Sequence, residues 1–164
     1  MVKATVGLVT IGALVGSWAA LAGESGSATG RYATHVTSAE LSKLPDGGAV
    51  EMSHYRQIIF VAEGEHPIDN SSADCVGRFR VSPEGVVTSG SGVCYTTNAE
   101  GDGSSFWWRM DEAGTESCPT ICGVWGYFDG FGKLAGIKGT GWWKQAVAFS
   151  EGGIGTWGGS YAIE

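Results

Sequence analysis

Hydrophobic and polar side chains alternate along most of the chain in short runs, and Gly, Pro, Asn and Asp separate one run from the next. Within 31–37, for example, Tyr32, Thr34 and Val36 fall on one face of an extended chain. A period of two is typical of a β-strand with one buried face. The pattern predicts eight strands, at 31–37, 57–63, 75–81, 86–97, 104–111, 121–128, 140–149 and 156–163.

Two segments near the first strand lack this alternation. Residues 23–30 are rich in Gly and Ser, and we expect them to form a flexible leader. Ser38 can cap a short helical turn over 38–41, before the break at Pro45–Gly48. The folded domain is therefore expected to span 31–164.

Eight strands joined mostly by short turns favour one closed, antiparallel, up-and-down β-barrel, with a two-sheet sandwich as the alternative. Strands in barrels often bend at glycine. Five glycines fall inside predicted strands, namely Gly77, Gly90, Gly92, Gly123 and Gly126. The fold class predicted is all-β, a single barrel.

The N-terminus has the parts of a secretory signal peptide. Lys3 precedes an uncharged stretch from Ala4 to Ala19, and Ala20-Leu-Ala22 offers a cleavage site after residue 22. An uncleaved membrane anchor is the alternative, because the apolar run approaches the length needed to span a bilayer. We expect a secreted or periplasmic protein that does not remain in the membrane after cleavage.

Charge and cysteine content narrow the partners and the compartment. The formal net charge of −7 disfavours nucleic acid and anionic membranes, which would repel the chain. In an exported protein, four cysteines favour two disulfides. If Glu84-Gly85 form a two-residue hairpin loop, Cys75 faces Cys94, which leaves Cys118 to pair with Cys122. A zinc site is the less favoured reading, since 75 and 94 are too far apart in sequence for a usual ligand pair.

A glycine-dense segment, Phe128–Trp143, predicts a tight corner between two strands. Its core, Phe131-Gly-Lys-Leu-Ala-Gly-Ile-Lys-Gly-Thr-Gly141, and the closing Gly155-Thr-Trp-Gly-Gly-Ser-Tyr161 resemble the allene oxide cyclase barrel-like proteins, relatives in shape of lipocalins and plant dirigent proteins. The resemblance implies an eight-stranded barrel, often exported, and homo-oligomers, either dimers or trimers. No catalytic residue of the family matches a position here, and we expect no cofactor.

The aromatic residues are the main candidates for a ligand site. Six tryptophans follow residue 22, and adjacent ones in a strand must point to opposite faces. The more apolar faces predict that Phe106, Trp108 and Met110, and likewise Trp143, Val147 and Phe149, point inward. These rings either fill the barrel or edge a cavity, with Trp125 as a further ligand-binding candidate. Trp107 and Trp142 would point outward, to an oligomer surface or a sugar-stacking patch.

Polar candidates are fewer. His35, His54 and His66 show no spacing typical of a catalytic pair. The acidic pairs Glu63/Glu65 and Asp111/Glu112 read as solvated strand ends. Arg78 and Arg80 share a face, where they either clamp an anionic ligand or form the wet side of the barrel. Residues 98–103 begin like a calcium loop, but Arg109 stands where a bidentate Glu is needed, and a hairpin turn explains them equally well.

The sequence thus predicts a protein that binds a small apolar or aromatic ligand, or that has a structural role. The ligand-binding candidates are Phe106, Trp108, Trp125, Trp143, Arg78 and Arg109. A cofactor-independent isomerase or cyclase is the alternative, and Glu63, Arg78 or Arg109 inside an open cavity would favour it. Adhesion to polysaccharide or protein through Trp107 and Trp142 is the third reading.

Overall fold

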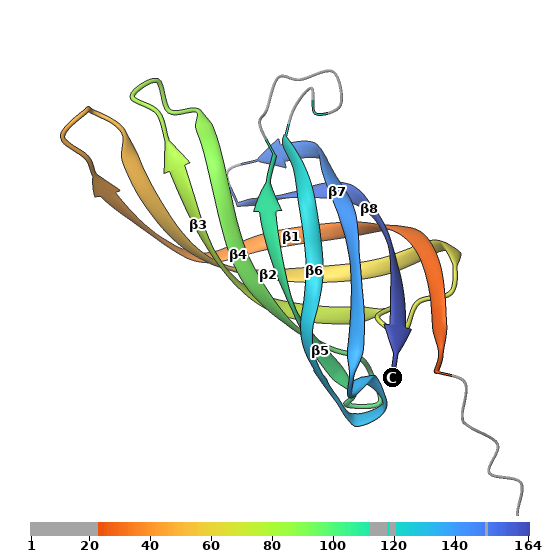
Figure 1. Ribbon diagram of the computed structural model, residues 1–164. Coiled ribbons are helices and arrows are strands. Elements are labelled where there is room, and N and C mark those ends of the chain that lie inside the picture. The colour runs from red at the N-terminus through yellow and green to blue at the C-terminus, as the bar shows by residue number, and fades with distance from the viewer. Residues whose placement is uncertain (1–22, 112–117, 119–120, 150) are drawn as a thin grey trace, which may run out of the picture.

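The computed structural model describes residues 23–111, 118, 121–149 and 151–164, so the expected signal peptide lies outside the described residues. The predicted barrel is confirmed: eight antiparallel strands follow one another around a closed sheet, and β1 also pairs with β8 (Figure 1). The strands are β1 (Ser25–Lys43), β2 (Ala49–Gly64), β3 (Ser71–Val81), β4 (Val87–Thr97), β5 (Gly103–Met110), β6 (Ile121–Phe131), β7 (Ile137–Phe149) and β8 (Gly152–Ile163).

Strand β1 differs from the prediction at both ends. The expected leader is part of the sheet, because Ser25–Gly30 pairs with Trp157–Ala162 of β8. The expected helical turn at Ser38–Leu41 is wrong as well, since these residues pair with His54–Glu51 of β2. In both places a neighbouring strand supplies backbone partners, and this outweighs the weak local preferences of Gly, Ser and Ala.

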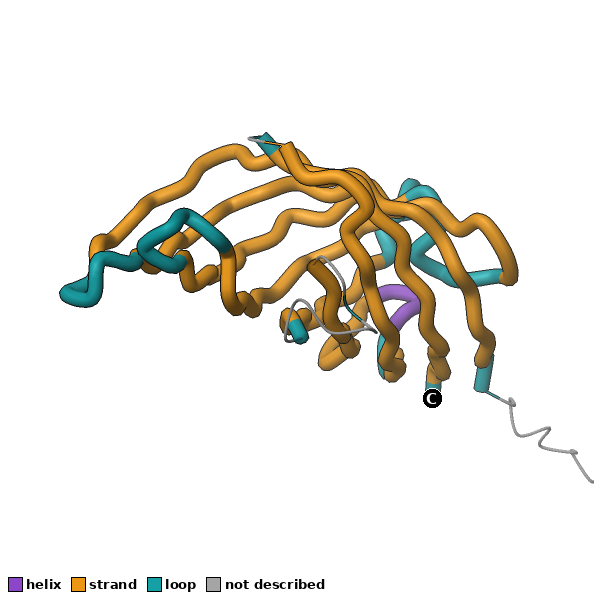
Figure 2. Tube along the Cα trace, turned by 90° about the horizontal axis from the view of Figure 1, so that it is seen from above, coloured by secondary structure: helices purple, strands orange, loops and turns teal. Residues whose placement is uncertain are grey.

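Two hairpins continue beyond the closed part of the barrel. Pairing of β1 with β8 ends at His35, whereas β1 and β2 stay paired to Lys43 and Ala49. Similarly, β4 pairs with β5 only from Ser91 onward. Residues 37–54 and 79–90 therefore form a hairpin extension, whose tips lie on the side away from the C-terminus in Figures 1 and 2.

The register of β3 and β4 places Cys75 opposite Cys94, as predicted. The turn itself is different: the Ser82 N–H donates to Val86 O and the Gly85 N–H to Ser82 O, which closes a three-residue loop with Gly85 at φ +81°. A register shift beside Arg80 and Val81 compensates for the extra residue. A bulge thus restores the alignment that a two-residue loop would have given.

Glycines let the interior rings lie close to the sheet. The Trp108 ring covers Gly77 and Gly92, which pair with each other across β3 and β4. The Trp125 ring covers Gly141 and Gly159, a pair across β7 and β8. A side chain at any of these positions would occupy the space that the indole now fills, so the aromatic core depends on glycine in the neighbouring strands.

Replacing Gly159 by Ala is expected to lower the free energy of unfolding by about 2 kcal/mol, as overpacking of a core does. The added Cβ would lie 2.5 Å from the Trp125 ring and 2.7 Å from the Thr140 carbonyl oxygen. Urea denaturation measures the change. The control is Gly26→Ala, where the atoms nearest to the added Cβ belong to the Tyr161 side chain, at 3.0 Å or more. Equal stability of the two variants would contradict the expectation.

The glycine-dense segment forms a tight corner between two strands, as the sequence predicts. Strand β6 ends at Phe131, a short 3₁₀ turn η1 (Gly132–Leu134) follows, and β7 begins at Ile137. Gly132 and Gly136 have φ of +65° and +79°, a region that other residues rarely adopt. Leu134 and Ile137 are each only 3% exposed, so the corner supplies apolar side chains to the floor of the barrel.

Both predicted disulfides are present, Cys75–Cys94 and Cys118–Cys122. Disulfides persist in oxidising compartments, and this chain is therefore suited to an oxidising compartment. Within the described residues, no helix has the length and apolar character that crossing a membrane requires.

Candidate functional site: an aromatic cavity with one polar wall

A cavity of about 300 Å³ lies inside the barrel. Ile68, Tyr127 and Trp157 line it toward the end closed by η1, and Val87, Ile121 and Ala148 line it toward the end with the hairpin extension. Ala148 is exposed, and Val87 and Ile121 are half-buried, so the cavity opens at that second end. We call this opening the mouth. A volume of this size suits a small organic molecule.

One side of the cavity is aromatic, and the predicted rings form it. Phe106, Trp108, Trp125 and Trp143 all line the cavity, and the first three are buried. Trp108 lies edge-on to Trp143, with ring centroids 6.0 Å apart, and Phe79 lies 5.4 Å from Trp108. The Trp108–Trp143 contact is edge-to-face, a favourable arrangement, and the Phe79 ring is tilted by 32° against Trp108, so neighbouring rings restrict one another. The aromatic wall is therefore preorganised.

The other side is a polar wall that the sequence analysis missed. Glu51, Ser53, Tyr55 and Gln57 occupy alternate positions of β2 and all line the cavity, in order from the mouth inward. The strand was predicted to begin only at Gln57, which left the other three outside any element. Their spacing of two was the available signal, and pairing with β1 and β3 is what extends the strand over them.

Glu51 is the charged member of this wall. It is half-buried, and the Ser53 hydroxyl donates a hydrogen bond to its carboxylate. Its cross-strand neighbours are Leu41 and Phe79, both apolar. Glu51 therefore lies at the mouth between apolar side chains, directly beside the first ring of the aromatic wall.

The buried polar groups of the tyrosines and of Trp143 that line the cavity are neutral. Burial raises the pKa of the Tyr32 and Tyr55 hydroxyls above its usual range, so both remain protonated at neutral pH. The Nε1 of Trp143 is buried and has no hydrogen-bond partner among the described residues. An unpaired buried donor costs free energy, and an acceptor on a bound molecule or on water would satisfy it.

His66 lies beyond the cavity floor, in the loop between β2 and β3, and is 5% exposed. Its Nδ1 accepts the Ile68 N–H at 3.4 Å, which places the proton on Nε2. Its ring packs against those of Tyr161 and Trp157, at 4.7 and 5.3 Å between centroids. Burial lowers its pKa to about 4, so the imidazole is neutral at pH 7. His66 is therefore a neutral side chain packed among aromatic rings below the cavity.

Several predicted cavity residues lie on the outer face instead. Arg78 and Arg109 are exposed, because they alternate with Gly77, Phe79, Trp108 and Met110, which point inward. Arg80 bonds to Asp46 at the tip of the first hairpin.

A bulge reverses the expected orientation of one further side chain. One extra residue between Gln145 and Val147 turns Val147 outward, where it is 50% exposed. Glu63 is exposed at the end of β2, as its reading as a solvated strand end predicts. The orientation predicted for the Phe149 side chain falls outside what the structure describes.

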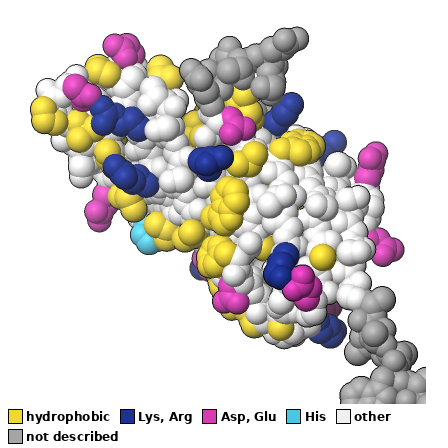
Figure 3. Space-filling view, in the orientation of Figure 1, with side chains coloured by type: hydrophobic (Ala, Val, Ile, Leu, Met, Phe, Trp, Pro, Cys, Tyr) yellow, Lys and Arg dark blue, Asp and Glu magenta, His cyan; other side chains and the backbone are white. Residues whose placement is uncertain are grey.

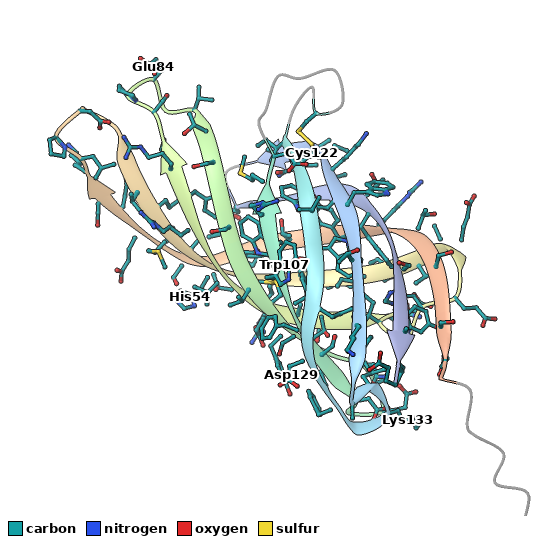
Figure 4. The ribbon with its side chains drawn as sticks, viewed as in Figure 1. His54, Glu84, Trp107, Cys122, Asp129 and Lys133 are labelled. Atoms are coloured by element: carbon teal, nitrogen blue, oxygen red, sulfur yellow. A yellow bond between two sulfur atoms is a disulfide. The ribbon has the colours of Figure 1, made fainter. Side chains whose placement is uncertain are left out.

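The outward tryptophans are placed as predicted. Trp107 and Trp142 are 37% and 41% exposed, and their rings lie over Gly126 and Gly158 of the neighbouring strands. Figure 4 labels Trp107 on this side of the barrel, and Figure 3 shows that hydrophobic side chains gather on the same face. Nearby strands also expose Tyr95 and Phe131, whose rings stack with centroids 5.4 Å apart.

The segment that begins like a calcium loop is a hairpin turn. Asn98 Oδ1 accepts the N–H groups of Glu100 and Asp102, and Gly101 has φ +87°. Asp102 in turn accepts the Lys133 N–H and ties this turn to η1. Across the described residues, no group of three His, Cys, Asp or Glu side chains is arranged to hold a metal ion.

Comparison with known proteins adds no assignment to this geometry. No protein-family model matches the chain, and no curated protein matches its sequence.

Proposed function

We propose that the chain is an exported binding protein that holds one small apolar or aromatic molecule inside the barrel. The observation that carries the proposal is the cavity of about 300 Å³, which opens at one end. Aromatic rings line it on one side, and the polar wall of β2 lines it on the other. Ligand sites are commonly concave and apolar with a few placed polar groups. The N-terminal signal pattern and the disulfides support export.

Binding is favoured over catalysis by where the ionisable residues lie. An isomerase or cyclase would need an acid or base at the reacting atoms. The three residues whose inward placement would have favoured an enzyme, Glu63, Arg78 and Arg109, are on the outer face. Among the described residues, the carboxylate that lines the cavity is that of Glu51, and it lies at the mouth, away from a molecule held among the deeper rings. The likeness to the allene oxide cyclase barrel-like family is therefore proposed for the shape of the protein, and its chemistry is not carried over.

Titration with N-phenyl-1-naphthylamine tests the proposal, because this neutral dye fluoresces strongly once it leaves water. We expect saturable binding of one dye per chain, with quenching of tryptophan fluorescence as the dye approaches Trp108 and Trp143. Native mass spectrometry of protein from its own source would show a bound natural ligand directly. Absence of saturable dye binding would contradict the proposal.

A bulky residue in the mouth should block the same site. Val87→Trp adds an indole where β4 lines the cavity, and we expect dye affinity to fall at least tenfold, about 1.4 kcal/mol. The matched control is Val93→Trp, the same substitution on the outer face of β4, where the residue is 49% exposed. Similar affinity in the two variants would show that the dye binds elsewhere. Near-ultraviolet circular dichroism checks that both variants fold.

A further inference from the structure

We infer that the ligand is a small organic cation, an amine or quaternary ammonium with an apolar body, whose charge lies at the mouth beside Glu51. The inference rests on the proposed binding function and narrows its ligand class. It follows from the charge of the cavity wall, from the rings that adjoin that charge, and from the charge of the whole chain.

Glu51 is the one formally charged side chain among the described residues that line the cavity; the other lining groups are apolar, aromatic, hydroxyl or amide. Its carboxylate accepts a hydrogen bond from Ser53, and within the described chain no ion pair neutralises it. Lys43 is on the same hairpin but pairs with Ala49, nearer the tip, and is exposed. The mouth therefore presents an uncompensated negative charge to an entering molecule.

The aromatic rings beside Glu51 favour a positively charged ligand over a neutral hydrogen-bond donor. Phe79 is the cross-strand neighbour of Glu51, and Trp108 and then Trp143 continue from it into the cavity. Tyr55, two residues further along β2 from Ser53, contacts Trp108 edge-on at 6.4 Å between centroids. Aromatic faces attract ammonium groups, most strongly where water is excluded, and quaternary ammonium ligands are typically held in such surroundings.

The net charge of the whole chain also favours a cationic ligand. A chain with a formal net charge of −7 attracts cations and repels anions at long range. An anionic amphiphile, such as a fatty acid, would meet Glu51 at the mouth without a described lysine or arginine in the cavity wall to receive its carboxylate. The wall therefore selects against acidic ligands as well as for basic ones.

Two probes of the same shape test the inference: benzyltrimethylammonium, which is cationic, and neopentylbenzene, its neutral isostere. Each is titrated against the naphthylamine-loaded protein, and dye displacement is measured. We expect the cation to bind at least tenfold more tightly than the neutral probe. In Glu51→Gln this preference should disappear, because the variant loses affinity for the cation. Glu40→Gln removes one charge from the outer side of the same hairpin, where Glu40 pairs with Met52, and should keep the preference.

The outcomes separate this inference from the proposed function. If the dye binds but the two probes compete equally, or if Glu51→Gln keeps the preference for the cation, the inference of a cation site is wrong. The proposed binding function is unaffected by that result. If Glu40→Gln loses the preference as fully as Glu51→Gln does, the effect comes from net charge alone, and the site at Glu51 is again wrong. If the dye does not bind the wild-type protein, both the cavity function and the cation site are overturned.

Discussion

Replacing both Cys75 and Cys94 by alanine is expected to lower the free energy of unfolding by about 3 kcal/mol. The bond joins residues 19 apart in sequence, and it closes a loop that the unfolded chain would otherwise be free to open. Both cysteines are nearly fully buried in the core of the barrel, at 3% and 2% exposed, so lost packing adds to the effect. Urea denaturation at constant protein concentration measures the change.

The second disulfide provides the comparison for this experiment. Cys118 and Cys122 are only 4 residues apart, so the same double alanine replacement should cost less, about 2 kcal/mol by the same loop-closure relation. Strong reductant should destabilise the wild-type protein and leave the Cys75→Ala/Cys94→Ala variant much less affected. Equal melting temperatures of the wild type with and without reductant would refute a stabilising role for these bonds.

Lowering the pH from 7 to 4 is expected to remove about 3 kcal/mol of stability through His66 alone. The unfolded imidazole takes up a proton near its usual pKa of about 6.5, whereas burial among aromatic rings lowers the folded pKa to about 4. Between these values the unfolded state binds more protons, so stability is present at neutral pH and is lost as the pH falls. Below the folded pKa the loss through this residue stops.

The experiment compares the pH dependence of unfolding in the wild type with that in His66→Gln. The variant loses the ring packing of His66, but its curve should lack the fall between pH 6.5 and 4 that the histidine causes. His54→Gln, at an exposed position on the outer face of β2, is the matched control and should run parallel to the wild type. Parallel curves for His66→Gln and the wild type would contradict the expectation. Nuclear magnetic resonance titration of the His66 ring in the wild type gives an independent check.

The alternation of side chains was enough to predict the barrel and its aromatic wall. In a strand, the faces of neighbouring residues are fixed relative to one another, so the inward choice of Trp108 over Trp107 required only the apolar character of Phe106 and Met110. The Cys75–Cys94 contact was predicted from a two-residue turn, whereas the actual turn is a three-residue loop. The predicted contact forms because the bulge beside Arg80 and Val81 restores the register.

What could not be predicted depends on single inserted residues and on pairing partners. A bulge adds one residue and reverses every orientation after it, which is why Val147 points outward against the expectation. The polar wall was missed because Glu51 and Ser53 have little intrinsic strand preference and become part of β2 only through contacts with β1 and β3. The best candidate for ligand charge recognition was therefore hidden by an error in a strand boundary.

The pairing of β1 with β8, which we call the seam, affects the order in which the barrel folds. Every other strand pairs with its neighbour in sequence, but at the seam the Thr34 hydroxyl bonds to Gly153, 119 residues away. Contacts of such long sequence separation form late, because the chain between them must first be ordered. Hairpins can assemble one by one as the chain emerges, yet the cavity does not exist until the last strand docks. If the barrel holds a ligand as proposed, that ligand can enter only after β8 has paired with β1.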